Sequence, residues 1–594
     1  MKKKLRWAVL LILTGSLLLG QISCATRSSQ NDETASGKPE TSGTETETKP
    51  DPKPGNDEKE GGMIDLYLIA GQSNGAGFSA LTEAFRASDP LFTQGYSHIL
   101  YCGNSAATYG GGKVQYLPRV VTLQETVAGL GKDASYFGPE LGMAKALSAY
   151  YNAESGKKAG IIKYAAGGTT LSDVTGGRYP AAGNWASPSY LRENGAKGAL
   201  SGGLYRNFIK QVQTGIAEYE KAGYTVAIKG LFWMQGESDS KLSGITSTYP
   251  HMFECLVQDM RKDLGEMTST DLSALPILVG EISDAYNIRH LETSAAFIAM
   301  QNRMVNAMEH VYTVRSGVFG VGTDATDASH WTSDDMLTIG QMVGTQFLNV
   351  CKGVKSSEPI GGDAVASVYS ADGQLTGTYS SLSYAVNVAS AGSTVKLLRD
   401  LELYGNLNIN NRNPVTLDGN GFRINSHSVT HGVRLVGCNV TLRNFEFYHC
   451  HNSASAYGIY VYEGASLVFE SGELNAYRFG IVVNQDSTVT VNGGTISIRN
   501  GDAEKCGALY VSYGGSPAPT RNNSSQITVN GGTLCASGKA TAIYISDVKG
   551  NCAAVRLQAG TISAASRQNA VRVVSKTATC QIGDNIIYVT TDKS

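Results

Sequence analysis

Short apolar runs and amphipathic segments alternate along residues 63 to 353. The apolar runs, rich in β-branched and aromatic residues, predict buried strands at Leu66–Gly71, Ile161–Ala166, Val226–Met234, Pro276–Glu281 and Gly317–Gly322. The segments between them have helical periodicity and predict helices at Pro139–Tyr151, Leu204–Ala222, Tyr249–Leu264, Ser294–His310 and Met336–Val350. This alternation indicates an α/β fold of three layers, with helices on both faces of a parallel sheet.

From residue 363 to residue 594 the pattern changes to short segments in which apolar and polar residues alternate. One motif recurs as Gly432–Leu435, Gly458–Val461, Gly480–Val483, Ala508–Val511, Ala542–Ile545 and Ala570–Val573. A second motif, Val-Thr-Val-Asn-Gly-Gly-Thr or a variant, recurs at Val489–Thr495, Ile527–Thr533 and Val555–Thr561. Two offset motifs repeated at about 22 to 34 residues are typical of a solenoid. They predict an all-β, right-handed parallel β-helix, with one short helix before it at residues 381–389.

The first 24 residues predict an export signal. Basic residues at positions 2 to 6 precede the apolar stretch Trp7–Leu19, which is too short for a membrane span with stop-transfer flanks. The segment Gln21–Cys24 resembles a lipoprotein cleavage box and makes Cys24 the expected lipidation site. Cleavage without lipid is the alternative, because a leucine is usual at the position of Gln21.

Two polar segments separate these regions. Residues 25–62 contain almost no apolar side chains, so they predict a solvated tether, and residues 354–362 predict a shorter linker. The expected order is therefore signal (1–24), tether (25–62), α/β domain (63–353), linker (354–362) and β-helix (363–594). We expect an exported protein, anchored by lipid at the cell surface or in the periplasm, or otherwise secreted.

Charge and cysteine content exclude several classes of partner. Lys and Arg number 49 against 51 Asp and Glu, a net charge of −2, so nothing favours binding to nucleic acid or to an anionic membrane. The ten cysteines have irregular spacing without CxxC pairs, so the sequence predicts no disulfide scaffold, no metal and no cofactor. Four histidines gather in the β-helix at His427, His431, His449 and His451; a zinc site is one interpretation, and solvated loop histidines are the commoner one.

Ser73 is the candidate nucleophile. It lies in Gly71-Gln72-Ser73-Asn74-Gly75, at the carboxyl end of the first predicted strand, where ligands bind in parallel sheets. The pentapeptide satisfies the G-x-S-x-G pattern of α/β-hydrolases. Their nucleophile follows several strands, however, whereas only a signal and a tether precede this one. Alone, the segment could also be a structural turn.

Three further segments supply possible partners for Ser73. His330 could act as its base, and Asp327, three residues earlier, could orient that histidine locally. After another strand, Gln235 and Glu237 point to the same side of an extended backbone, and the Gln235 amide suits an oxyanion hole. Gly168 follows a further strand, where glycine lets a backbone amide approach closely.

Together these segments resemble SGNH-type carbohydrate esterases, in particular the sialate O-acetylesterase and acetylxylan esterase group, carbohydrate esterase family six. The resemblance covers roughly residues 63 to 350 and rests on Gly71–Asn74, Gly167–Thr169, Trp233–Asp239, Asp327–His330 and Phe137–Gly142. It implies a three-layer, flavodoxin-like domain with a parallel sheet.

The resemblance also assigns roles. It implies that Ser73 attacks the ester and that His330 acts as general base and then acid. The oxyanion would be held by the Ser73 amide, a Gly167 or Gly168 amide and the Gln235 side chain. Asp327 is the expected partner of His330, and Glu237 is the alternative. Trp331, where the family usually has a more apolar residue, could shape the sugar site.

The expected activity is the deacetylation of a polysaccharide or glycan. The β-helix has no evident carboxylate cluster for catalysis, so a glycan-binding or spacer role is expected there. Exposed tyrosines could stack on sugar rings or could pack the coil corners: Tyr460, Tyr462, Tyr510 and Tyr544. The competing hypothesis is a surface adhesin whose β-helix binds glycan and whose esterase-like domain is inactive.

Overall fold

The structure is a computed structural model that describes residues 62–591 apart from 90–91, 93–94, 107–114, 117–120, 124–134, 175–182, 284–290, 321–328, 351–363, 454–455, 503–504, 513–523 and 547–552. The predicted export signal, Cys24, almost all of the tether, the linker at 354–362 and Asp327 lie outside the described residues. No described helix combines the length and the apolar character that crossing a bilayer requires.

A parallel sheet forms the centre of the first region, and its strands largely match the predicted apolar runs. In spatial order the parallel strands are β3 (Tyr96–Ala106), β7 (Lys158–Ala165), β1 (Met63–Gly71), β8 (Thr225–Met234), β9 (Ile277–Gly280) and β10 (Val311–Val314). Two short strands, β4 (Gln115–Tyr116) and β5 (Val121–Leu123), pair antiparallel with β3.

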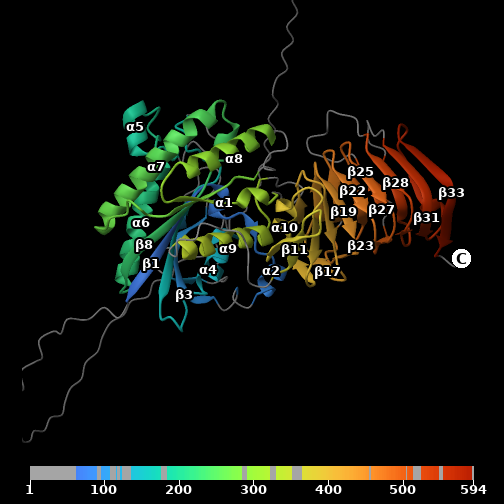
Figure 1. The fold of residues 1–594 in the computed structure, drawn as a ribbon, viewed down its shortest axis with the longest axis horizontal. Coiled ribbons are helices and arrows are strands. Elements are labelled where there is room, and N and C mark those ends of the chain that lie inside the picture. The colour runs from blue at the N-terminus through green and yellow to red at the C-terminus, as the bar shows by residue number, and fades with distance from the viewer. Residues whose placement is uncertain are drawn as a thin grey trace, which may run out of the picture. The chain divides into compact units, whose positions relative to one another are not determined.

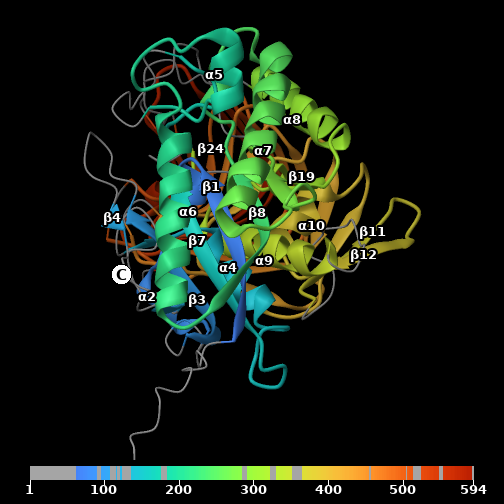
Figure 2. The same ribbon diagram turned by 90° about the vertical axis from the view of Figure 1, so that its left-hand side faces the viewer.

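Helices cover both faces of this sheet because its strands are apolar on both sides. Leu66 and Leu68 of β1 pack in the core shared with α6 (Gly203–Lys221), α7 (Ile245–Thr268) and α8 (Leu291–Asn306). Tyr67 and Ile69 belong to the core on the opposite face, with α4 (Pro139–Leu147) and α9 (Ser333–Val350). Figure 2 shows α6 and α7 in front of β1, β7 and β8. The predicted three-layer fold is confirmed.

The order of the strands determines where a site can form. Strand β3 lies between β1 and β7 in the chain. If it is left out, the parallel strands lie in the spatial order β7-β1-β8-β9-β10. Numbered along the chain, this is 2-1-3-4-5, the flavodoxin-like order. The chain leaves β1 toward one side of the sheet and later returns to its other side at β8. Ligands bind at the carboxyl ends of strands at such a switch point. The segments after β1 and β8 carry Ser73 and Gln235.

One predicted strand is wrong. The last of the five predicted strands was placed at Gly317–Gly322. The structure has this strand earlier, as β10 (Val311–Val314), and part of the predicted segment forms a 3-10 turn at Ser316–Val318. The error follows from the preceding helix, which ends at Asn306 rather than at His310. His310 has a left-handed φ of 56°, and its carbonyl accepts from the Ile277 amide, so the chain turns there and enters the sheet directly.

The second region is a parallel β-helix with three ladders (Figure 1). The first ladder runs through β13 (Thr394–Leu397), β16 (Val415–Asp418), β19 (Asn439–Arg443), β22 (Ser466–Phe469), β25 (Thr488–Val491), β28 (Gln526–Val529) and β31 (Ala554–Ala564). The second runs through β14 (Leu401–Leu403), β17 (Arg423–Ser426), β20 (Phe445–His449), β23 (Gly472–Ala476), β26 (Thr495–Ile498), β29 (Thr533–Cys535) and again β31. The third runs through β15 (Leu407–Ile409), β18 (His431–Val436), β21 (Tyr457–Tyr462), β24 (Phe479–Val483), β27 (Gly507–Val511), β30 (Thr541–Ile545) and β32 (Val571–Val573).

Both sequence motifs occupy constant places in this coil. All six copies of the first motif lie in the third ladder, in register through Val433, Ile459, Ile481, Leu509, Ile543 and Val571. The second motif crosses the corner between the first and second ladders. There Gly494 and Gly532 take φ of 75° and 83°, a conformation that favours glycine. The repeat therefore predicted the strands and one of the corners.

An antiparallel hairpin and a short helix begin the β-helix, and one long strand ends it. The hairpin is β11 (Ala366–Tyr369) with β12 (Leu375–Tyr379), and the helix α10 (Leu382–Val388) confirms the predicted helix at 381–389. At the far end, β33 (Thr579–Thr590) pairs with β31.

Candidate active site

Ser73 is the first residue of the short helix α1 (Ser73–Ala76), directly after β1. The turn before it packs against β8, since the Gln72 amide donates to the Met234 carbonyl at 2.8 Å. Gly71 has a φ of 141°, and a Cβ there would lie 2.1 Å from the Met234 carbonyl oxygen. Only glycine fits this approach. The first amides of a helix have no partner within it, so Ser73 starts α1 among free N–H groups.

Asn74 connects Ser73 to two other predicted site segments. Its Nδ2 donates to Glu237 Oε1 at 2.7 Å and, more weakly, to the Ser329 carbonyl at 3.4 Å. Asn74 and Glu237 are both buried. Ser329 directly precedes His330, so one amide group brings together the nucleophile, the acidic residue after β8 and the histidine segment. Asn74 directly follows Ser73 in the motif, but no role was predicted for it from the sequence.

His330 is 9% exposed and stacks on Phe78, with ring centroids 4.3 Å apart. Burial raises the pKa of Glu237, and the hydrogen bond from Asn74 and the charge of His330 oppose that rise. Glu237 is therefore within electrostatic range of His330. Asp327 lies outside the described residues, so the choice between Asp327 and Glu237 as the partner of His330 stays a prediction.

Gly168 follows β7 in a left-handed conformation, with a φ of 70°, and is partly exposed. The strand ends beside it are in register, because Ala165 of β7 pairs with Gly71 of β1. The Ala166 amide also donates to the Gly71 carbonyl at 3.0 Å. The turns that contain Gly168 and Ser73 therefore begin at neighbouring strand ends, as an oxyanion hole built from their amides requires.

The Gln235 side chain is fully buried and already hydrogen-bonded within the protein. Its Nε2 donates to Asp239 Oδ2 at 2.5 Å and to the Thr169 carbonyl at 3.1 Å, and its Oε1 accepts from Tyr249 at 2.8 Å. These bonds hold the turn after Gly168 against the segment after β8. Gln235 as a direct donor to the oxyanion stays a prediction, since it would have to release one of these partners.

Asp239, the last residue of the Trp233–Asp239 motif, supports the same turn. Its carboxylate accepts from the amides of Leu171 at 2.9 Å and Ser172 at 3.0 Å, in addition to the bond from Gln235. Asp239 is fully buried. We did not assign it a role from the sequence, and its partners show that it shapes the segment that follows Gly168.

A buried ion pair supports the helix that carries Ser73. Lys163 Nζ of β7 lies 2.9 Å from Glu140 Oε2 of α4 and donates to the Ala76 carbonyl at 3.0 Å. Glu140 Oε1 accepts from the Gly138 amide at 2.8 Å. Burial lowers the pKa of Lys163, and Glu140 opposes that change. The sequence signal was a lysine inside a predicted buried strand, which needs a partner.

Trp331 directly follows His330 in the chain. Its side chain is fully buried and donates from Nε1 to the Phe319 carbonyl at 3.1 Å. Trp331 therefore points into the core, and its expected role in shaping the sugar site stays a prediction.

The four tyrosines proposed as a stacking surface, Tyr460, Tyr462, Tyr510 and Tyr544, do not form an open platform. Tyr462 and Tyr544 are buried rather than exposed, at 6% and 3%. Tyr460 stacks on Tyr462 at 4.6 Å between ring centroids, and Tyr510 stacks on Tyr544 at 5.2 Å. Ring faces that cover one another are not available for a sugar, so these residues stabilise the third ladder.

The four β-helix histidines do not form a metal site among the described residues. Burial lowers the pKa of His431 to about 3 and that of His449 to about 4. His427 pairs with Glu402 at 2.6 Å. The expectation that these histidines lie on solvated loops is wrong for His431 and His449, which are buried.

Asp335, in the first turn of α9, is buried next to a second carboxyl. Its side chain is 2% exposed, and burial together with Asp334 raises its pKa to about 8, against the opposing effect of the Thr332 and Ser383 hydroxyls. A carboxyl group with a raised pKa stabilises the fold fully below its ordinary pKa of about 4, and that contribution is lost as the pH rises toward 8.

We therefore expect Asp335→Asn to raise the melting temperature relative to the wild type increasingly between about pH 5 and pH 8. Tryptophan fluorescence suits the measurement, since Trp185, Trp233 and Trp331 all lie in the first region and are buried. Asp271→Asn is the control, because hydrogen bonds from Ser273 lower the pKa of this exposed aspartate. A difference between Asp335→Asn and wild type that does not change with pH would contradict the assignment.

The fold and the site define a class of protein, an α/β esterase-type domain with a serine at the switch point of its sheet. Residues 63–349 match the family described as carbohydrate esterase, sialic acid-specific acetylesterase. These residues, about half of the chain, therefore form a domain of that carbohydrate esterase family, and the resemblance found in the sequence is confirmed.

Similar solved structures include a protein from Arabidopsis thaliana, at 20% identity over 48% of this chain and 98% of that chain, with a TM-score of 0.32. The structure titled NanS is 16% identical over 49% of this chain and 98% of that chain, with a TM-score of 0.33. A carbohydrate acetylesterase from Xanthomonas citri is 15% identical over 53% of this chain and 69% of that chain, with a TM-score of 0.34. A search of curated proteins found no match. The family assignment rests on the family match.

Proposed function

We propose that this protein is an exported carbohydrate O-acetylesterase that uses Ser73 as nucleophile and His330 as general base. The observation that carries the proposal is the bridge formed by Asn74, which joins the nucleophile turn to Glu237 and to the carbonyl that precedes His330. The family match adds the class of substrate, an acetylated glycan.

The proposed reaction has two steps. In the first, Ser73 Oγ attacks the acetyl carbonyl as His330 removes its proton, and the sugar oxygen leaves with the proton that His330 returns. In the second, His330 takes a proton from water as the water oxygen attacks the acetyl-enzyme carbonyl. The bond between the acetyl carbon and Ser73 Oγ then breaks, His330 returns the proton to Ser73 Oγ, and the acetic acid released ionises to acetate. Amides of Ser73 and Gly168, with Gln235, hold the oxyanion in both steps. Asp327 or Glu237 orients His330.

We also propose that the protein acts outside the cytoplasm, from the predicted export signal and from Cys24 as lipid anchor. The solvated tether at 25–62 would hold the esterase away from the membrane surface. The substrate would then be an acetylated polysaccharide or glycan in that compartment.

The test is acetate release by the full chain from a panel of acetylated xylan, acetylated pectin and O-acetylated sialic acids. A fluorophosphonate that reacts with activated serines identifies the nucleophile by peptide mass spectrometry. We expect acetate from at least one substrate and modification of Ser73. Glycan binding without acetate release or labelling would instead support the adhesin hypothesis, and labelling of another serine would overturn the assigned nucleophile.

A further inference from the structure

The segment that contains His330 packs directly against the first coil of the β-helix. Asp334, four residues after His330, accepts hydrogen bonds at Oδ2 from the amides of Tyr404 at 2.8 Å and Gly405 at 2.6 Å. Both amides lie between β14 and β15. A carboxylate that accepts from two successive amides makes strong, charge-assisted bonds.

Two other contacts join this part of the first domain to the same coil. Gly405 lies so close to Thr332 that a Cβ on Gly405 would be 2.4 Å from the Thr332 Cβ. Gly320 lies ten residues before His330 in the chain, and its carbonyl accepts a hydrogen bond from Asn408 of β15 at 3.3 Å.

We infer that the first coil of the β-helix positions His330, and that Asp334 is the positioning residue through which it acts. This inference rests on the proposed function and deepens it, because it makes the β-helix part of the catalytic fold rather than an appended spacer. A histidine base must be held close to its productive geometry, and an error of about 1 Å can cost on the order of 10²-fold in rate.

The first test is Asp334→Ala in the full chain, compared with Asp334→Asn, which keeps an acceptor oxygen. We expect Asp334→Ala to lower kcat about 10- to 100-fold with KM within about twofold, and Asp334→Asn to recover most of that loss. Rates are expressed per folded protein, with the folded fraction taken from tryptophan fluorescence, so misfolded protein does not count. The matched control is Asp400→Ala, which removes an aspartate that accepts from the Arg423 amide within the β-helix.

Hydrogen exchange provides a readout that does not depend on activity. We expect the peptide that spans Ser329 to Met336 to exchange faster in Asp334→Ala and to be unchanged in Asp400→Ala. If the wild type releases no acetate, the proposed function fails. The hydrogen-exchange comparison then decides by itself whether the β-helix positions the His330 segment. Unchanged exchange, or a kcat within twofold of wild type, overturns the inference.

Gly405→Ala tests the same contact while it leaves Asp334 intact. Its new Cβ must displace Thr332, two residues from His330, so we expect kcat to fall although the change lies in the β-helix. Gly198→Ala is the control, because nothing lies within 4 Å of a Cβ there. Equal kcat in Gly405→Ala and wild type would contradict a positioning role for this coil.

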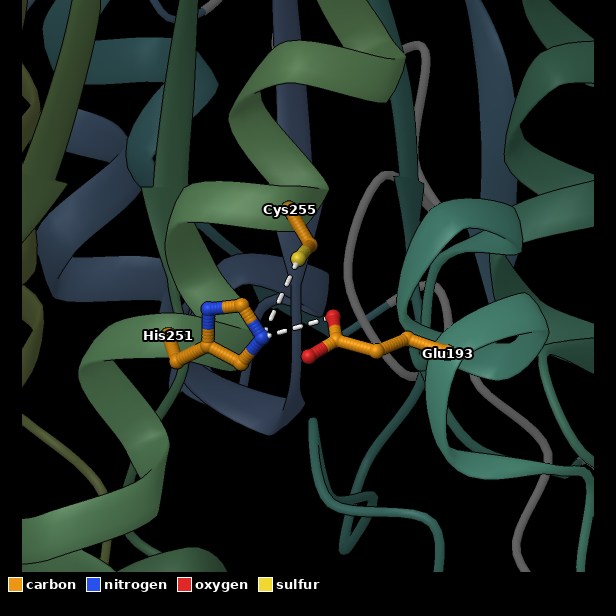
Figure 3. Close-up of side chains that lie close together, drawn as sticks. All are labelled: Glu193, His251 and Cys255. Atoms are coloured by element: carbon orange, nitrogen blue, oxygen red, sulfur yellow. Dashed lines mark hydrogen bonds and ion pairs between the residues drawn. The ribbon is translucent and has the colours of Figure 1, made fainter.

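A second observation concerns a different part of the first domain. Glu193 of α5 (Pro188–Asn194) and His251 and Cys255 of α7 converge on one point (Figure 3). His251 Nε2 lies 2.9 Å from Glu193 Oε2 and 3.9 Å from Cys255 Sγ, and all three ligand atoms lie within 4.8 Å of one another. Zinc is bound by these ligand types at about 2.0 to 2.3 Å, so small side-chain movements would accommodate it.

Helix α5 packs on the core through Tyr190, whose ring also contacts His251 at 6.1 Å between ring centroids. It has no buried residue, and its polar contacts to α7 are the His251 pair and two bonds from Ser189 to Asp259 at 2.7 Å. We propose that Glu193, His251 and Cys255 bind one Zn²⁺, with water as the fourth ligand, and that the ion links α5 to α7. Such a link would stabilise the segment of the chain between β7 and α6, which begins with the Gly168 turn and contains α5.

Cobalt reports on this site without reference to catalysis. Titration of the full chain with Co²⁺ should give one equivalent of a thiolate charge-transfer band, which Zn²⁺ removes. We expect Cys255→Ser to abolish the band and His251→Ala to weaken binding by roughly tenfold or more. His98→Ala, which removes a partly exposed histidine paired with Ser97, is the control. Absence of the band in the wild type, or a band that survives Cys255→Ser, overturns the proposal.

Discussion

Replacing Ser73 with alanine is expected to lower kcat for acetate release by about 10⁴-fold or more. The change removes the hydroxyl that forms the acetyl-enzyme in the proposed mechanism, while the turn, the helix and the amides around it remain. Residual turnover would come from binding and from the oxyanion donors alone. Acetate release under saturating substrate measures the effect, and the same variant should lose labelling by fluorophosphonate.

Ser367→Ala is the matched control for this variant. Ser367 is also buried, lies on β11 of the β-helix, and its hydroxyl has no hydrogen-bond partner, so its loss should leave activity unchanged. A Ser73→Ala protein that keeps turnover within tenfold of wild type would rule out the covalent mechanism. Activity lost in both variants would point to a general effect on folding instead.

Replacing Lys163 with methionine is expected to destabilise the esterase domain by about 3–5 kcal/mol, because it leaves the buried Glu140 carboxylate without its counter-charge. The Ala76 carbonyl loses its partner as well, which weakens the support of the helix that begins with Ser73. We therefore also expect the activity of the protein to fall at temperatures where the domain remains folded. Glu140→Gln should be destabilising in the same way, since it leaves the Lys163 ammonium buried and uncompensated.

The double variant Lys163→Met/Glu140→Gln should lose less stability than the two single variants together, since no buried charge remains and the amide oxygen introduced by Glu140→Gln can still accept from the Gly138 amide. Urea unfolding followed by tryptophan fluorescence measures these changes, because all tryptophans of the described residues lie in this domain. The control is Lys262→Met, which breaks the exposed pair with Glu266 and should cost less than about 1 kcal/mol. Strict additivity of the two core variants would contradict a coupled ion pair.

The sequence predicted the parts of the site that depend on neighbours in the chain. Ser73 was found because it lies in a glycine-rich turn at the carboxyl end of a strand, where ligands bind in parallel sheets. The repeats of the β-helix were found because every coil meets the same environment. The motif Trp233–Asp239 was found as a whole, but only Gln235 and Glu237 received roles. Asp239, which supports the Gly168 turn, was missed because its partners Leu171 and Ser172 lie 68 and 67 residues away.

Pairs that are distant in sequence explain the other errors. The expected exposure of Tyr462 and Tyr544 was wrong because alternation predicts which side of a strand a residue occupies but not what stacks on it. The strand after α8 was misplaced because a left-handed residue at His310 starts β10 earlier than the apolar pattern indicated.

The sequence by itself determined Ser73 as the candidate nucleophile, the family of the first domain and the presence of a β-helix, since each rests on local periodicity or on short motifs. Only the tertiary structure decided that Asn74 joins Ser73 to Glu237 and to the His330 segment, that Glu140 and Lys163 support the nucleophile helix, and that Asp334 binds the first coil of the β-helix. These contacts join residues 23 to 255 positions apart. Hydrogen bonds and buried charges over such separations exist only once the packing of strands and helices has brought their partners together, and no local pattern encodes them.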